Sequence, residues 1–139
     1  MMARTTSADR LLVCVSLFVG FAAAHLIDEF LFGAPAEFHL SEAVTEMLSL
    51  AFVAALAGLV ALAGRGSRTS YLGLMIIGSV IAAADLAKHG AEMAQPGPWR
   101  SGVVSAFLAI GLVLSGSLTA VLAYGQWRRA GDAAGDREQ

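Results

Sequence analysis

The sequence predicts an all-α integral membrane protein, folded as a four-helix antiparallel bundle. Of its 139 residues, 57% are hydrophobic and only 14% are charged, which is too apolar for a soluble domain of this length. Four apolar segments each come close to the roughly 20 residues that cross a hydrocarbon core about 30 Å thick. We expect a single transmembrane domain over residues 1–139, with spans at about 11–32, 43–63, 71–93 and 102–126.

The positions of the arginines predict the orientation of the bundle in the membrane. One side, comprising both tails and the turn after the second span, carries Arg4, Arg10, Arg65, Arg68, Arg128, Arg129 and Arg137. The opposite side has only Arg100 outside the spans. Because positively charged loops stay in the cytoplasm, we expect a protein of the cell membrane with polar cytoplasmic tails at 1–10 and 128–139.

The first span also resembles a secretory signal, since Ala22, Ala23 and Ala24 would suit a small-residue cleavage site. Cleavage there would leave His25 as a new amino terminus. However, the apolar run continues beyond these alanines, and a retained helix completes an even number of spans that agrees with the arginine bias. We therefore expect residues 1–24 to be retained and the first span, at about 11–32, to continue through His25.

Ionisable residues gather at the end of the first span and at the beginning of the second. His25, Asp28 and Glu29 are spaced i, i+3 and i+4 and so share one helical face. Gly33 to Pro35 break this helix, and Ser41 is a suitable N-cap for the next. A helix that already includes His39 would place it on one face with Glu42 and Glu46. Glu42 has a simpler explanation, because a carboxylate in the first turn suits the helix dipole.

The third span repeats this pattern, whereas the fourth does not. Asp85, His89 and Glu92 share one face at i, i+4 and i+7, and Lys88 is placed to pair with Asp85 or Glu92, or to reach outward to the interface. The fourth span has no ionisable residue over 102–126, so we expect it to act as a packing wall without supplying a ligand.

A shift of 60 residues aligns the two helix pairs and predicts two pseudo-repeated hairpins. Residues 22–26 (AAAHL) then align with residues 82–86 (AAADL). Such parallel repeats are related by an axis along the membrane normal. His25 and Glu29 take the places of Asp85 and His89, so a histidine and an acid would face each other twice across this axis.

The leading hypothesis for these groups is a transition-metal site, because unpaired carboxylates in hydrocarbon cost several kcal/mol unless a cation, a proton or water compensates them. Imidazole and carboxylate ligands suit zinc, iron or manganese. A haem held by His25 and His89 is disfavoured by the acids beside both residues. The expected ligands are His25, Glu29, Glu46, Asp85 and His89. The expected rim comprises Asp28, His39, Glu42, Lys88 and Glu92.

Two other interpretations use the same residues without a metal. Neighbouring histidines and acids could form a proton or cation relay or a polar ligand pocket. Alternatively, they could only join helices in a structural or accessory subunit, in a homo-oligomer or a larger membrane complex. The expected partner is the lipid bilayer. No phosphate-binding glycine loop, nucleophile elbow or basic patch with aromatics is present, so we expect no nucleic-acid partner, and no reaction is indicated.

Overall fold

The computed structural model describes residues 6–31, 39–94 and 102–135, and within these ranges the chain is helical without any strand. The helices are α1 (Ser7–Leu31), α3 (Glu42–Gly64), α4 (Arg68–Ala94) and α5 (Val103–Gly135). All four are long and apolar enough to cross a membrane. The predicted all-α bundle is confirmed, and its composition suggests a multi-pass membrane protein.

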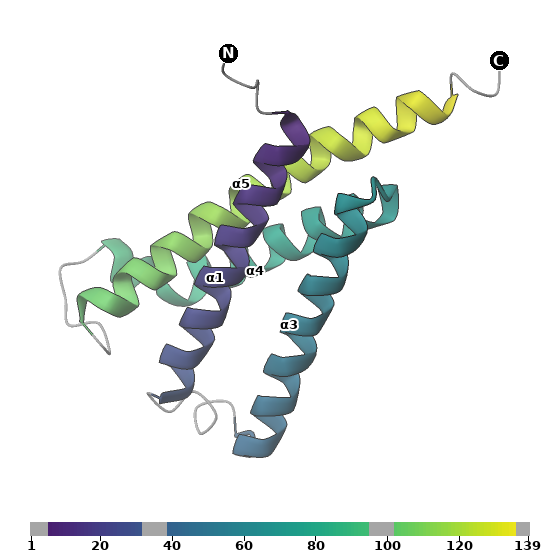
Figure 1. The fold of residues 1–139 in the computed structure, drawn as a ribbon. Helices are drawn as coiled ribbons and strands as arrows, with labels where there is room; N and C mark the ends of the chain where they lie inside the picture. Colours follow the sequence, from purple (N-terminus) through teal and green to yellow (C-terminus); the bar gives the residue numbers. More distant parts are fainter. Residues whose placement is uncertain (1–5, 32–38, 95–101, 136–139) are drawn as a thin grey trace, which may run out of the picture.

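Successive helices run in opposite directions, so both chain ends and the α3–α4 turn lie at one end of the bundle (Figure 1). Helix α5 packs extensively against α4 and α1, whereas α3 makes far fewer contacts with α1 and α4. Within the described residues of α3, only Leu56 and Ala63 are buried. Helix α5 is therefore the centre of the bundle, with α1 and α4 packed against it and α3 attached more loosely.

The buried core consists of two apolar clusters. One contains Leu11, Val15, Ala63, Tyr71, Leu74 and Ala123. The other contains Phe18, Ala22, Leu56 and Leu112. The second cluster ends one helical turn before His25, so apolar packing holds α1 in place directly below the polar residues.

The helix beginnings follow from local hydrogen bonding. At the start of α1, the Asp9 amide donates to Thr6 Oγ1 at 3.2 Å, and Asp9 Oδ2 accepts from the Thr6 amide at 2.8 Å. This reciprocal pair is a capping box. As predicted, Ser41 caps α3, because the Val44 amide donates to its hydroxyl oxygen at 3.3 Å. The capping box also shows that residues 7–10, predicted as part of a polar tail, are helical.

Helix α5 continues to Gly135, so residues 128–135 of the expected polar tail are helical. Tertiary contacts hold this extension in place. Gln126 Nε2 and Arg129 Nη1 donate to the Ser7 hydroxyl at 2.9 and 2.5 Å. The Arg68 guanidinium lies 4.8 Å from the centre of the Trp127 ring. Residues 1–5 and 136–139 lie outside the described part of the chain.

Helices α4 and α5 approach closely where two glycines face each other. A Cβ atom added at Gly78 would lie 2.6 Å from the carbonyl oxygen of Gly116, and one added at Gly116 would lie 3.1 Å from that of Gly78. Small residues at such crossings let helix backbones approach each other in a membrane. This contact sets the position of α4, which carries two of the candidate ligands, Asp85 and His89, about two and three turns beyond Gly78.

Candidate metal centre

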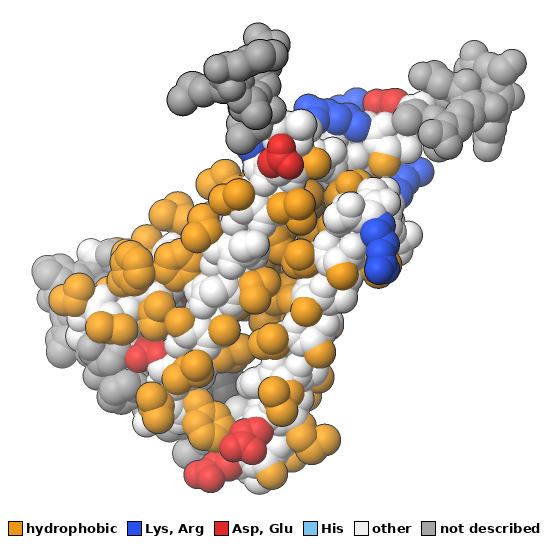
Figure 2. Space-filling model, viewed as in Figure 1, with side chains coloured by type: hydrophobic (Ala, Val, Ile, Leu, Met, Phe, Trp, Pro, Cys, Tyr) orange, Lys and Arg blue, Asp and Glu red, His pale blue; other side chains and the backbone are white. Residues whose placement is uncertain are grey.

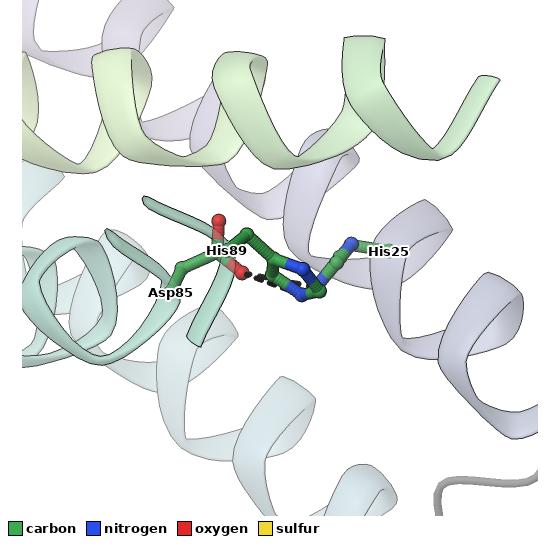
Figure 3. A group of neighbouring side chains, drawn as sticks. All are labelled: His25, Asp85 and His89. Carbon is green, nitrogen blue, oxygen red and sulfur yellow. Dashed lines mark ion pairs between the residues drawn. The ribbon is translucent and has the colours of Figure 1, made fainter. Parts of the chain in front are cut away.

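Two histidines and one aspartate from α1 and α4 form a buried cluster. His25 comes from α1, and Asp85 and His89 come from α4, where their i, i+4 spacing places them on one face. Their exposed fractions are 7%, 7% and 6%. Each residue offers one ligand atom, and these atoms all lie within 4.8 Å of one another. Figure 3 shows the three side chains pointing toward a common centre.

The carboxylate of Asp85 lies close to both imidazoles. His25 Nε2 is 3.0 Å from Asp85 Oδ1, and His89 Nε2 is 3.9 Å from the same oxygen. The two imidazole rings meet edge to face, with their centroids 5.5 Å apart and an angle of 84° between their planes. One oxygen atom therefore lies near two nitrogen atoms, which is an arrangement that either shared protons or a cation would stabilise.

Glu29 joins this cluster from α1 and connects it to Lys88. Its Oε1 lies 3.4 Å from His89 Nε2 and 3.9 Å from His25 Nε2. Its Oε2 forms an ion pair with the Lys88 ammonium, whose side chain is 29% exposed. The sequence had suggested Asp85 or Glu92 as the partner of Lys88, but the structure shows this ion pair reaching across to α1. The ammonium thus offsets the charge of Glu29.

The two histidine–acid pairs in contact are the two that the 60-residue shift places opposite each other. His25 faces Asp85, and His89 faces Glu29. Each pair joins α1 to α4. Each helix therefore supplies one histidine and one acid, and the two histidine–acid contacts lie about one helical turn apart.

Two buried atoms of the cluster have no hydrogen-bond partner among the residues that the structure describes. They are His25 Nδ1 and Asp85 Oδ2. Leaving such an atom unsatisfied costs about 1–3 kcal/mol. The donor set and the available lone pairs both fit a metal ion, because a nitrogen and a carboxylate oxygen are ordinary ligands of first-row metals.

The fourth transmembrane helix contributes a polar contact that the sequence analysis missed. Ser105 of α5 donates a hydrogen bond to Asp28 Oδ2 at 2.5 Å, and both side chains are buried. Asp28 is thus next to Glu29 in the sequence, but its carboxylate accepts a hydrogen bond from α5. The only available signal was a serine near the start of an otherwise apolar span, and serines are common in such helices.

Three other predicted site residues lie outside the cluster. Glu46 is exposed and lines a separate cavity with residues of α1, so the structure does not bring it together with the histidines. Glu42 is exposed in the first turn of α3, in agreement with the helix-dipole interpretation. His39 is exposed and precedes α3 with φ 55°. Glu92 belongs to α4, but its side chain lies outside the described residues.

Comparison with known proteins provides no precedent for this arrangement. No protein family, curated protein or solved structure matches the chain. The chemistry of the site itself must therefore indicate the function.

Among the described residues, carboxylates outnumber ammonium groups around the cluster. Asp28, Glu29 and Asp85 are buried carboxylates on α1 and α4, and Lys88 supplies one ammonium nearby. Buried charges of one sign are costly unless they are compensated. A bound cation or protons on the imidazoles would provide such compensation, so metal ions and protons would compete for the same site.

Proposed function

We propose that this protein binds a single divalent transition-metal ion inside the membrane through His25, Asp85 and His89. The observation that supports this proposal is the presence of three buried ligand atoms within 4.8 Å of one another on two facing helices. Glu29 is adjacent to both histidines and would orient an imidazole, as carboxylates beside metal-bound histidines commonly do.

Zinc, iron and manganese are the metals that suit this ligand set. Two imidazoles and one carboxylate, with further positions open, are typical of non-haem iron, and catalytic zinc also takes three protein ligands. A haem fits less well. Its plane would have to pass between the two imidazoles, where Asp85 Oδ1 lies 3.0 Å from one ring nitrogen and 3.9 Å from the other.

We expect purified protein to retain one transition-metal ion per chain, measured by elemental analysis after removal of loosely bound ions. Retention should fall as the pH is lowered, because imidazole and carboxylate groups must be deprotonated to bind a metal. The fold should be monitored by circular dichroism at each pH, so that metal loss can be separated from unfolding. An intact, helical protein that carries no metal at neutral pH, and takes up none from excess zinc, iron or manganese, would contradict the proposal.

A proton relay is the second candidate, and it is favoured by the continuity of the polar contacts. His25 contacts Asp85, His89 contacts Glu29, and Glu29 pairs with Lys88 at the partly exposed edge of the cluster. A relay predicts metal-free protein that carries protons across liposomes, with the flux abolished by Asp85→Asn. If Asp85→Asn instead destabilises the bundle without any such flux, the groups join helices only. A homo-oligomer or larger membrane complex stays a prediction of the sequence.

We propose that both termini face the cytoplasm and that the metal centre lies in the outer half of a cell-membrane protein. Basic side chains gather at the end of the bundle where the termini lie (Figure 2). They include Arg65 and Arg68 around the α3–α4 turn and Arg128 and Arg129 near the end of α5. The cytoplasmic placement of such charges is the usual rule for membrane proteins.

The orientation can be tested by cysteine labelling in intact cells. In a Cys14→Ala background, an impermeant thiol reagent should label Gly97→Cys, which lies in the connection between α4 and α5, and should not label Ser67→Cys. Permeabilised cells provide the control, because both cysteines should then react. The reverse pattern would place the termini outside and move the metal centre to the cytoplasmic half.

A further inference from the structure

A cavity of about 760 Å³ lies between α1, α3 and α4, directly beside the candidate metal centre. Most of its wall is apolar and includes Leu26, Phe52 and Ile81. One part of the wall is polar and is formed by His25, Glu29, Asp85 and Lys88. Its volume is within the range of about 300–1,000 Å³ that is typical of pockets for small organic ligands. The cavity thus joins a large apolar space to the buried charged cluster.

A second cavity adjoins the first between α1 and α3, on the side of these helices that would face the bilayer. It has a volume of about 380 Å³ and shares Leu26 and Ser49 with the first. Its other wall residues include Ile27, Leu31 and Leu50, which are among the exposed apolar side chains that would face lipid. Because α3 is also the least buried helix, a molecule dissolved in the membrane could enter by displacing few contacts.

The polar wall restricts the kind of head group that the cavity can accept. The wall carries the carboxylates of Glu29 and Asp85 and the ammonium of Lys88, so a head group of either charge would lie beside a like charge inside the membrane. Carboxylates only accept hydrogen bonds, whereas the Lys88 ammonium only donates them. A hydroxyl group can donate to the former and accept from the latter. Two cavity-lining residues, His25 and Asp85, also have the unpartnered atoms described above.

We infer that this cavity binds an uncharged, lipid-soluble alcohol that enters from the bilayer between α1 and α3. Its hydroxyl lies at the polar wall, and its hydrocarbon tail lies along the apolar wall. The inference rests on the proposed function in one respect, because His25 and Asp85, which are proposed to hold the ion, also form part of the polar wall. It thereby names the class of molecule that would meet the metal centre.

The inference can be tested by photolabelling the full-length protein in lipid nanodiscs. Three probes share one dodecyl chain with a photoreactive diazirine and differ only in their head group, which is a hydroxyl, a carboxylate or an ammonium. We expect the alcohol to label the protein saturably, with unlabelled dodecanol as competitor, and the two charged probes to show little saturable labelling. Mass spectrometry should locate the alcohol adducts on cavity-lining residues. Equal labelling by all three probes would overturn the inference.

Two adjacent alanines of α4 provide a matched pair of variants. Ala84 lines the cavity, whereas its neighbour Ala83 does not. Ala84→Phe fills the cavity and should lose most of the saturable labelling, and Ala83→Phe should retain it. Ser49→Trp gives a second block from α3, at the boundary of the two cavities. Labelling that persists in both blocking variants would overturn the inference, even if one of them is poorly folded.

Metal content measured on the same samples separates this inference from the proposed function. Wild-type protein that holds its metal but binds no alcohol selectively would overturn the inference and leave the metal site standing. Metal-free protein that still binds the alcohol selectively, with labelling lost in Ala84→Phe, would support the cavity ligand and contradict the metal site. Selective labelling of the wild type that is lost in Ala84→Phe, with metal retained in both alanine variants, would support the two proposals together.

Discussion

His25→Asn and His89→Asn should each remove the metal ion from the purified protein, as measured by elemental analysis. Each change removes one of the three proposed ligands and leaves a side chain that can still form hydrogen bonds. Even residues that only support metal ligands typically change affinity by about 10–100-fold, so losing a ligand should exceed that range. The helical content should stay unchanged, because the apolar clusters and the α4–α5 contact do not involve these imidazoles.

His39→Asn provides the matched control for these variants. His39 is exposed and lies outside the cluster, and asparagine tolerates its left-handed backbone conformation. This variant should therefore hold as much metal as the wild type. If all three variants keep their metal, or all three lose it, the ion is bound elsewhere and the centre described here is not its site.

Gly78→Val should cause a large loss of stability of the bundle. The nearest neighbour of an added Cβ is the carbonyl oxygen of Gly116 at 2.6 Å, and the next is the backbone nitrogen of Ala120 at 3.3 Å. Backbone atoms cannot rotate away as a side chain can, so α4 and α5 would have to separate. Overpacking typically costs about 1–3 kcal/mol, and a backbone clash by a branched side chain should reach or exceed the upper end.

The measurement is thermal or denaturant unfolding in detergent, and Gly58→Val is the control. An added Cβ at Gly58 of α3 would meet no atom within 4 Å, so this variant should unfold close to the wild type. Because Gly78 lies on the helix that carries Asp85 and His89, the destabilised variant should also bind metal less tightly. Equal stability of the two valine variants would show that the α4–α5 crossing does not limit the fold.

The sequence determined the number, order and direction of the helices, because these depend on local properties. Apolar length sets which segments can cross a membrane, and Ser41 marks the start of α3 through its own side chain. The helix ends were less predictable. Residues 128–135 look like a polar tail, but contacts of Trp127 and Arg129 with α4 and α1 accompany the continued helix.

The sequence also determined which polar residues share a helical face. The spacing of His25 with Glu29, and of Asp85 with His89, is a consequence of helical periodicity alone. The shift of 60 residues further indicated which histidine would face which acid. The contacts between His25 and Asp85 and between His89 and Glu29 agree with that alignment.

Only the tertiary structure decided which of these faces meet and which remain apart. Counting residues along a helix gives the depth of a side chain, but the rotation of the helix and its distance from its neighbours depend on packing. The close contact at Gly78 and Gly116 and the loose attachment of α3 are features of that kind. They bring Lys88 to Glu29 and Ser105 to Asp28, and they leave Glu46 on the rim of another cavity. No local pattern encodes these distances, because each depends on side chains from two helices at once.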